Sequence, residues 1–439
     1  MRRFNVTGVC VPEKHYMVDI SDKLAQIKEM VDYGDYFTIN RARQYGKTTT
    51  LSLLKKMLKS EYIVASISFE RLGDESFEST AAFCRAFMRL IQRTLSFTDV
   101  SEEYRKNWLN SEVMDFNELS FHITEMCKPG AVGSDKKIVL MIDEVDKTSD
   151  NRIYMHFLGM LRDKYLERAK NKDCTFHSVI LAGVYDIKNI KLKMMGEGAY
   201  TPAVAESKLF NSPWNIAANF KIDMSFSPPE IATMLAEYEA DHRTGMSIPI
   251  IADEIFNYTS GYPFLVSRLC QCIDEELSED WTHHGIQEAV RTILDEKNTL
   301  FDDIYKNLEN NKDLYDFIYG LIVIGDGNGF NIYNPIIDLG NTYGFLKKGE
   351  GGKAVVSNRI FEILMYDYFI SKDSIPKKRL TGVIQRDVVD GGRFDMELCL
   401  RKFAEHYAEL FSERDARFIE REGRLLLLSY LKPLINGQE

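Results

Sequence analysis

Short apolar runs alternate with amphipathic stretches over the first half of the chain. The strand candidates are residues 36–40, 63–69, 138–142, 178–183 and 220–226. The helix candidates, in which apolar residues recur at helical spacing, are residues 20–31, 48–59, 76–127 and 154–169. Strands that alternate with helices favour an α/β domain with a mainly parallel sheet, because continuous apolar runs suit strands that are covered on both faces.

The pattern changes after the last strand candidate. Prolines at 228 and 229, followed by Glu230, predict the start of a helix, and helical periodicity continues from there. Residues 343–346 and 354–357 then predict two short strands around a glycine-rich turn, with helices on either side, which is typical of a winged-helix module. The predicted division is residues 1–228 for the core, 229–300 for a helical lid, 301–372 for a winged-helix-like domain and 373–439 for a linker and a helical C-terminal segment.

Residues 41–50 read Arg-Ala-Arg-Gln-Tyr-Gly-Lys-Thr-Thr-Thr and connect the first strand candidate to a helix candidate. Backbone N–H groups in such a turn surround nucleotide phosphates, and the N-terminus of the next helix points at them. Gly46 would allow close approach, Lys47 would reach the β- and γ-phosphates, and Thr48 would place its hydroxyl on Mg²⁺. Arg41 stands where the usual motif has its first glycine, so either the loop turns differently or arginines supplement the phosphate site.

The apolar run at 138–142 ends in the acidic residues Asp143 and Glu144. Open α/β sheets bind ligands at the carboxyl ends of their strands. Asp143 would therefore hold Mg²⁺ together with Thr48, and Glu144 would orient or deprotonate the attacking water. The alternative is that these acids only begin a solvated loop, but a Gly-Lys-Thr turn and an Asp-Glu pair in this order favour nucleotide binding.

Further candidates surround these two motifs. His15, Tyr16 and Met17 could pack against adenine, although an ordinary buried aromatic is an equal alternative for Tyr16. Pro263, in the Gly-Tyr-Pro turn at the base of a lid helix, would lie near the nucleotide base. The predicted cofactor-binding residues are Arg41, Gln44, Tyr45, Gly46, Lys47, Thr48, Thr49, Tyr16 and Pro263. The candidates for sensing the γ-phosphate are Tyr185, Asp186, Lys188 and Asn189.

Composition narrows the function classes. The net charge of −11 argues against nonspecific nucleic-acid binding by the whole surface, although the local basic patches at 188–193 and 377–379 remain. The seven cysteines lack CxxC spacing, which predicts that they are reduced thiols and that they do not form a metal site. No run approaches the roughly 18 apolar residues of a membrane-spanning helix, and the first residues do not read as a secretory signal, so a cytoplasmic location is expected.

The chain resembles the bacterial family of AAA-ATPase-like proteins that carry a C-terminal nuclease-superfamily domain of the PD-(D/E)xK kind. The resemblance is carried by residues 15–19, 40–49, 139–144, 181–185, 261–264 and 422–437. It implies a P-loop core with a helical lid and a winged helix, similar to ATPases that act as signalling switches. The arginine-bearing phosphate loop resembles this family's own variant of the motif.

The resemblance also concerns the end of the chain. In relatives, the segment similar to residues 418–437 is the first helix of the nuclease fold, and Glu420 or Glu422 could match its glutamate. No Asp and Glu-x-Lys strand pair follows within the sequence, so a truncated family member or part of a longer protein is expected, without nuclease activity of its own.

The sequence therefore predicts an ATP-binding switch protein that hydrolyses ATP slowly with Mg²⁺. Glu144, Lys47 and Arg43 are the expected catalytic residues; Arg41 or Arg43 would neutralise developing charge, which a neighbouring subunit could also supply. A protein partner or self-association through the lid and winged helix is expected. Two alternatives stay open: a nucleotide-binding scaffold without turnover, and a nucleic-acid-dependent ATPase module of a defence-type nuclease system.

Overall fold

The computed structural model describes most of the chain up to the end of the predicted winged helix. The described residues are 2–98, 100–102, 104, 113–148, 152–184, 214–324, 328–372, 389–390, 393–394, 397 and 400–401. The predicted sensor residues 185–189, both basic patches and the nuclease-like residues 418–437 lie outside them. Within the described residues, no helix combines the length and the apolar character that crossing a bilayer requires.

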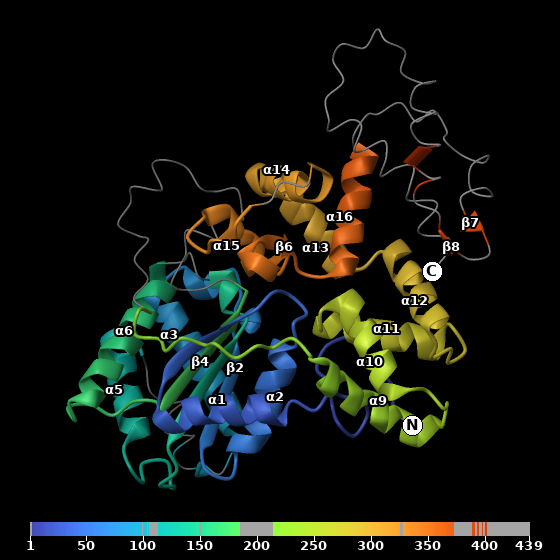
Figure 1. The fold of residues 1–439 in the computed structure, drawn as a ribbon. Coiled ribbons are helices and arrows are strands. Elements are labelled where there is room, and N and C mark those ends of the chain that lie inside the picture. Colours follow the sequence, from blue (N-terminus) through green and yellow to red (C-terminus); the bar gives the residue numbers. More distant parts are fainter. Residues whose placement is uncertain are drawn as a thin grey trace.

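A four-stranded parallel sheet forms the centre of the N-terminal half (Figure 1). Its strands are β1 (Tyr36–Asn40), β2 (Ile63–Ser68), β3 (Ile138–Asp143) and β4 (Ser178–Gly183), in the order β1-β4-β3-β2. These four strands confirm the sequence prediction. Alternate residues of β3 face two different cores, Val139 and Met141 one and Ile138 and Leu140 the other, which explains why the strand is apolar throughout.

The predicted strand at residues 220–226 is wrong. This segment has no strand hydrogen bonding, and only Ala218 just before it makes an isolated parallel bridge, to Phe37. Its apolar residues pack as a strand's would, with the Phe220 ring stacked 6.0 Å from that of Phe37. Its carbonyl groups are engaged by side chains, however, because Arg41 donates to the Ile222 oxygen and Lys23 to the Ser225 oxygen.

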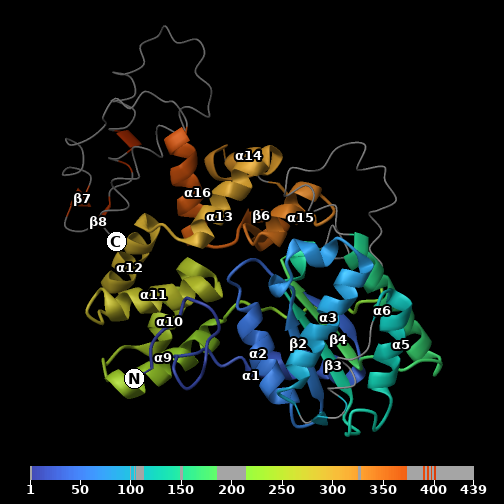
Figure 2. The same cartoon turned by 180° about the vertical axis from the view of Figure 1, so that it is seen from behind.

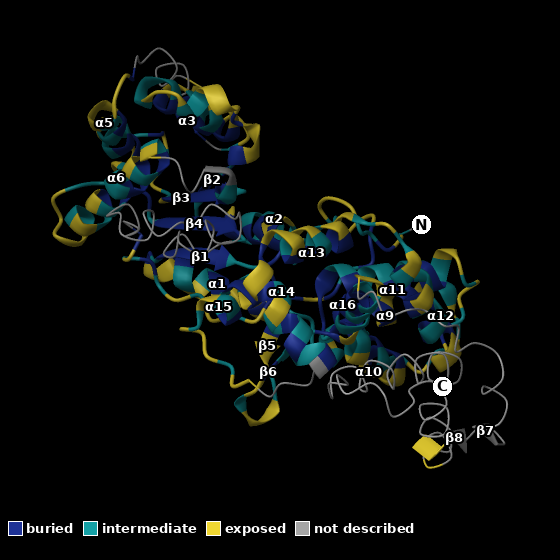
Figure 3. Ribbon diagram, turned by 90° about the horizontal axis from the view of Figure 1, so that it is seen from above, coloured by how far each residue is buried: buried dark blue, intermediate teal, exposed yellow. Residues whose placement is uncertain are grey.

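Helices cover both faces of the sheet. On one face, α1 (Ser21–Tyr33) and α2 (Lys47–Leu58) share a core with β1 and β4. On the other face, α3 (Thr80–Leu95), α5 (Phe116–Cys127) and α6 (Arg152–Ala169) form the second core (Figure 2). Figure 3 shows the buried strands lying between α1 and these three helices. The sheet is thus the middle layer of three, as its apolar strands require.

The predicted lid consists of helices. They are α9 (Pro228–His242), α10 (Ile248–Thr259), α11 (Pro263–Glu275) and α12 (His283–Asp295). The predicted helix start is confirmed, because Glu230 accepts a hydrogen bond from the Ser227 N–H at 2.7 Å in a capping box and prolines fill the first turn. Likewise, α11 begins at the predicted proline, Pro263.

The following segment combines helices with one hairpin. Its elements are α13 (Thr299–Asn310), α14 (Lys312–Tyr319), a π-helical turn (Gly320–Ile324), α15 (Pro335–Thr342), β5 (Leu346–Lys348), β6 (Ala354–Val356) and α16 (Arg359–Lys372). The antiparallel pair β5–β6 agrees with the predicted two short strands. Figure 1 shows these elements, in orange, above both the core and the lid. We refer to residues 299–372 as the α13–α16 segment.

Beyond this segment, β7 (Val389–Asp390) and β8 (Arg393–Phe394) form a second antiparallel pair. Both lie within residues 373–439, which were predicted as a linker and a helical C-terminal segment. One continuous hydrophobic core joins α1 and α2 to the lid and to the α13–α16 segment. The three predicted parts therefore pack against one another, and their boundaries as independent domains remain a prediction.

Candidate nucleotide-binding site

The phosphate loop, residues 41–48, connects β1 to α2. Gly46 is the N-cap of α2 and has a φ of 75°, and Gln44 is also left-handed, with a φ of 55°. A Cβ at position 46 would come no closer than 3.9 Å to Pro263, so the backbone conformation rather than space favours glycine there. Left-handed residues next to a helix N-terminus curl the backbone so that its N–H groups converge, which is the geometry of an anion site.

Lys47 is buried within this loop, with 7% of its surface exposed. Its ammonium donates to the carbonyl oxygens of Arg41 and Ala42, both at 2.9 Å. Burial lowers the pKa of the Lys47 ammonium, although the nearby carboxylates of Asp146 and Glu144 act in the opposite direction. The cation is therefore held inside the loop by acceptors that a phosphate oxygen could replace.

Thr48 and Asp143 meet across the end of the sheet. The Thr48 hydroxyl donates to Oδ2 of Asp143 at 2.8 Å, which joins the first turn of α2 to the last residue of β3. Asp143 is buried. A hydroxyl and a carboxylate are the oxygen ligands that Mg²⁺ uses beside nucleotide phosphates, so the donor set fits the predicted metal.

Glu144 follows directly and has a left-handed backbone, with a φ of 56°. Its N–H donates to Oδ1 of Asp143 at 3.0 Å, which fixes the turn after β3. Burial raises the pKa of the half-buried Glu144 carboxyl, Asp143 raises it further, and Lys47 acts in the opposite direction. A carboxyl with a raised pKa is suited to accept a proton from water near neutral pH.

Asp146 has a role that the sequence did not assign. Its Oδ2 accepts a hydrogen bond from the Val184 N–H at 2.6 Å, which ties the acidic turn to the end of β4. A Cβ at Gly183 would lie 2.7 Å from Oδ1 of Asp146, so the close approach needs a glycine. The only sequence signal was a third acid in the run after β3.

Arg41 turns away from the interior of the loop. Its guanidinium donates to the carbonyl oxygens of Asn40 at 2.7 Å and Ile222 at 2.5 Å, and lies 5.5 Å from the centre of the Phe220 ring. Burial lowers the pKa of this guanidinium. The side chain therefore fastens the segment before α9 to the phosphate loop, in place of the missing edge strand.

Arg43 and Gln44 contact α13. Arg43 donates to Asp303 at 2.9 Å, with 70% of its side chain exposed, and the Gln44 amide donates to the Thr299 hydroxyl at 3.1 Å. These bonds connect the phosphate loop to the start of the α13–α16 segment.

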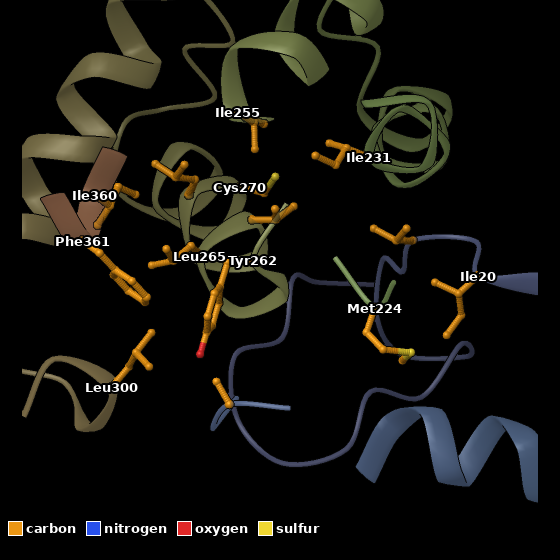
Figure 4. Packing of buried hydrophobic residues seen from close by; sticks show 14 of the residues in the cluster. Ile20, Met224, Ile231, Ile255, Tyr262, Leu265, Cys270, Leu300, Ile360 and Phe361 are labelled. Atoms are coloured by element: carbon orange, nitrogen blue, oxygen red, sulfur yellow. The ribbon is translucent and has the colours of Figure 1, made fainter. Parts of the chain in front are cut away.

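The lid contacts the same loop through Tyr262. Its buried hydroxyl donates to the Arg43 carbonyl oxygen, and its ring lies edge-on to that of Tyr45, with the centroids 4.7 Å apart. Figure 4 shows Tyr262 extending from the lid beside Leu300 and Phe361, and the rings of Tyr262 and Phe361 are 5.2 Å apart. The lid and the α13–α16 segment therefore both cover the loop.

Of the remaining predicted residues, two lie at the phosphate loop and Tyr16 lies elsewhere. Thr49 and Pro263 lie at the loop: the Thr49 hydroxyl accepts from the Cys10 N–H at 3.2 Å, and Pro263 faces Gly46. Cys10 is thereby a site neighbour that the sequence did not reveal. The N-terminal turn that carries it is fixed by a hydrogen bond of 2.8 Å from the Val11 N–H to Nδ1 of His15.

Tyr16, by contrast, is buried in an aromatic cluster with the lid. Its hydroxyl donates to Asp241 at 2.9 Å, and its ring lies 5.2 Å from those of Phe4 and Tyr238. These contacts favour the structural alternative for Tyr16. Its predicted contact with adenine remains untested.

Together, the parallel sheet, the loop that encloses Lys47 and the Thr48–Asp143 pair define a protein with the P-loop ATPase fold. Residues 11–318 match the family described as AAA-like domain, and the chain belongs to this family.

One solved structure supports the fold, and a second shows a weaker similarity. A Walker-type ATPase of Pyrococcus abyssi matches with a TM-score of 0.55 and 12% identity, over 82% of this chain and 99% of the other. The ORC2 protein of Aeropyrum pernix, in ADPNP-ADP complexes, matches with a TM-score of 0.40 and 11% identity, over 83% and 98% of the two chains. The TM-score of this second structure is too low to support an argument about the fold. No curated protein matches the sequence.

Proposed function

We propose that the chain binds ATP, hydrolyses it slowly to ADP and phosphate with Mg²⁺, and acts as a nucleotide-dependent switch. The observation that carries the proposal is the hydrogen bond of 2.8 Å between Thr48 and Asp143, directly beside the buried ammonium of Lys47. A cation, a hydroxyl and a carboxylate at the N-terminus of a helix are the combination that nucleotide phosphates and their metal require.

Phosphate binding is assigned to the loop and to Lys47. The N–H groups around Gly46 would donate to the phosphate oxygens, and the Lys47 ammonium would exchange its two carbonyl acceptors for phosphate oxygens. Thr48 and Asp143 would hold Mg²⁺, which supplies positive charge against the phosphates. Thr49, Pro263 and the turn at Cys10 would lie beside the nucleoside.

The hydrolytic step is assigned to Glu144. Its carboxylate would accept a proton from the water that attacks the γ-phosphate, and its raised pKa makes it a better acceptor than an ordinary glutamate. Arg43, the predicted source of positive charge for this step, is bonded to Asp303 and would have to leave it. Arg41 is held by backbone carbonyl groups. The positive charge that stabilises the transition state would therefore come from a partner protein or from a second copy of this chain.

The switch is assigned to the contacts that cover the phosphate loop. Nucleotide binding at the loop would compete with, or reposition, the bonds from Arg43 and Gln44 to α13 and from Tyr262 to the loop carbonyl. A ligand shifts such an equilibrium by its difference in affinity for the two arrangements. We infer that the α13–α16 segment is a winged-helix module that passes this change to a protein partner.

The second candidate is a scaffold that binds nucleotide without turnover. It is favoured by one observation, that both loop arginines are already bonded, Arg41 to carbonyl groups and Arg43 to Asp303. Glu144→Gln separates the two functions. In a hydrolase, this variant should stop phosphate release and keep ATP bound, whereas in a scaffold it should change neither.

Asp143→Asn tests the metal site directly. Asparagine keeps an oxygen that can accept from Thr48 but removes the charge, so Mg²⁺ should no longer strengthen ATP binding. The measurement is ATP affinity by calorimetry, with Mg²⁺ and with EDTA. Asp163→Asn, at an exposed position of α6, is the matched control. If the two variants respond to Mg²⁺ in the same way, the proposed site is refuted.

A further inference from the structure

Three potential metal ligands lie close together in the lid. They are His242, the last residue of α9, Asp274 in the last turn of α11, and Glu279 in the turn between α11 and α12. One ligand atom of each residue lies within 4.8 Å of those of the other two. Pro263, which faces the phosphate loop, begins α11, so Asp274 is separated from it by about 16 Å of helix. This cluster is therefore distinct from the proposed phosphate and Mg²⁺ site.

Tyr238 holds two of the three ligands in place. Its ring stacks on the imidazole of His242, with the centroids 4.0 Å apart and the planes 12° apart. Its hydroxyl donates to Oδ1 of Asp274 at 2.6 Å, which orients the carboxylate and leaves Oδ2 as a second oxygen. Side chains that orient ligands without binding the ion themselves are typical of metal sites.

The imidazole of His242 presents one nitrogen to the carboxylates. The side chain is only 9% exposed, and its Nε2 is buried without a partner among the described residues. Nδ1 instead lies 2.9 Å from Oε1 of Glu279, whose side chain is 41% exposed. Nδ1 is therefore the nitrogen that an ion would bind, and the ion could reach it from solvent on the Glu279 side.

The negative charges of the cluster are not balanced by a basic side chain. Within the described part of the chain, neither Asp274 nor Glu279 forms an ion pair with a lysine or an arginine. Arg2, whose guanidinium reaches α9, pairs with Glu237 and Asp241 instead. A divalent cation would balance the charges of both carboxylates.

The combination of one imidazole and two carboxylates favours Zn²⁺. Zinc binds such nitrogen and oxygen atoms at about 2.0–2.2 Å, so that the ligand atoms of a tetrahedral site lie about 3.3 Å apart. The ligand atoms of the cluster would have to approach one another by no more than about 1.5 Å. The ion would take the place of the hydrogen between His242 and Glu279. Mg²⁺ and Ca²⁺ prefer oxygen ligands alone, which the imidazole does not provide.

We propose that His242, Asp274 and Glu279 form a zinc site, with water as the fourth ligand. The ion would join the end of α9 to the end of α11 and to the turn before α12. Tyr16, whose hydroxyl donates to Asp241 beside His242, would connect this part of the lid to the N-terminal segment. Zinc would stabilise the folded lid, because the three ligands come together only in the folded chain.

Calorimetric titration of Zn²⁺ into the full chain, dialysed first against a chelator, tests this proposal. We expect Zn²⁺ to bind and to raise the midpoint of thermal unfolding. Co²⁺ is a second probe, and its visible absorption bands should appear without the near-ultraviolet charge-transfer band that cysteine thiolates produce. No nucleotide is present in these measurements, so the result does not depend on the proposed ATP binding.

Two variants locate the ion. Glu279→Gln keeps the size of an exposed side chain, and His242→Phe keeps a ring that can stack on Tyr238 but has no ligand nitrogen. Each should weaken Zn²⁺ binding by at least about tenfold, and each should remove the shift in the unfolding midpoint. His284→Gln is the control, because this histidine also lies near two carboxylates but is 76% exposed, and it should bind Zn²⁺ as the wild-type chain does. The proposal is overturned if the wild-type chain binds no Zn²⁺, or if either ligand variant binds it as tightly as the wild-type chain.

Discussion

Lys47 is the residue at which the proposed site can be tested most directly. In the structure its ammonium is buried and donates to the carbonyl oxygens of Arg41 and Ala42, both at 2.9 Å. Lys47→Met keeps the length and much of the volume of the side chain but removes the charge and its hydrogen bonds. The variant should bind ATP more weakly, because the phosphate oxygens lose their cation.

The expected size follows from an exchange of partners. Two hydrogen bonds from a charged donor contribute roughly 3–6 kcal/mol. In the free protein the ammonium already makes two such bonds, so binding gains only the difference between phosphate and carbonyl acceptors. Taking about half of the total, we expect a loss of roughly 1.5–3 kcal/mol, which corresponds to about 10- to 140-fold in affinity.

The assay is calorimetric titration of ATP with Mg²⁺ into the wild-type chain and Lys47→Met. Lys56→Met is the control, since Lys56 is an exposed lysine on the same helix. Urea unfolding checks that the variant is folded. Its free energy of unfolding should change by no more than about 2 kcal/mol, because the removal of a buried charge offsets the lost hydrogen bonds.

Equal ATP affinity in the wild-type chain and Lys47→Met would refute the phosphate loop itself. A loss much larger than 1,000-fold in a folded variant would instead refute the exchange argument. It would mean that the ammonium does not hold the two loop carbonyl groups before ATP binds.

Three further changes test other parts of the structure. Glu144→Gln should lower the rate of phosphate release by about 10²- to 10⁴-fold with ATP affinity retained, and a loss of affinity instead would contradict its role as a base. Burial and neighbouring carboxylates raise the pKa of Glu144 above the usual 4.5. As the pH is lowered, turnover of the wild-type chain should therefore begin to fall at a higher pH than it would with an ordinary glutamate as the base. The pH profile of Glu144→Gln should lack this decrease. Asp303→Asn removes the ion pair with the exposed Arg43, so the free energy of unfolding should change by less than about 1 kcal/mol, but ADP release followed by stopped flow should be faster. Unchanged release would show that α13 does not restrain the loop. Lys164→Met leaves the carboxylate of Asp173 without its buried cation, 2.7 Å away, and should lower the free energy of unfolding in urea by about 3–5 kcal/mol; a change under about 1 kcal/mol would mean that water replaces the pair.

Local sequence determined the centre of the fold. Four of the five strand candidates are strands, because each is apolar on both faces and short enough to cross one sheet. The phosphate loop could be recognised because Gly46, Lys47 and Thr48 are consecutive, so that one turn and one helix start fix their relative positions. Asp143 could be placed beside them because parallel strands present their carboxyl ends at one edge.

The fifth strand failed for a reason that no local pattern contains. Residues 220–226 have the apolar residues of a strand, but the carbonyl oxygens of Ile222 and Ser225 accept from Arg41 and Lys23, which lie about two hundred positions away in the sequence. Side-chain donors from distant segments thereby replace the ladder that would have made this segment an edge strand.

The same distinction applies to the site. The residues of the phosphate loop and of the acidic turn were predictable as a group, whereas the directions of Arg41, Arg43 and Tyr16 were not. Each of these side chains is long and ends in a polar group, and each finds its partner in a segment that is remote in the sequence. A short motif fixes the backbone of the loop. Only the packed lid and the α13–α16 segment decide which acceptors lie within reach of its side chains.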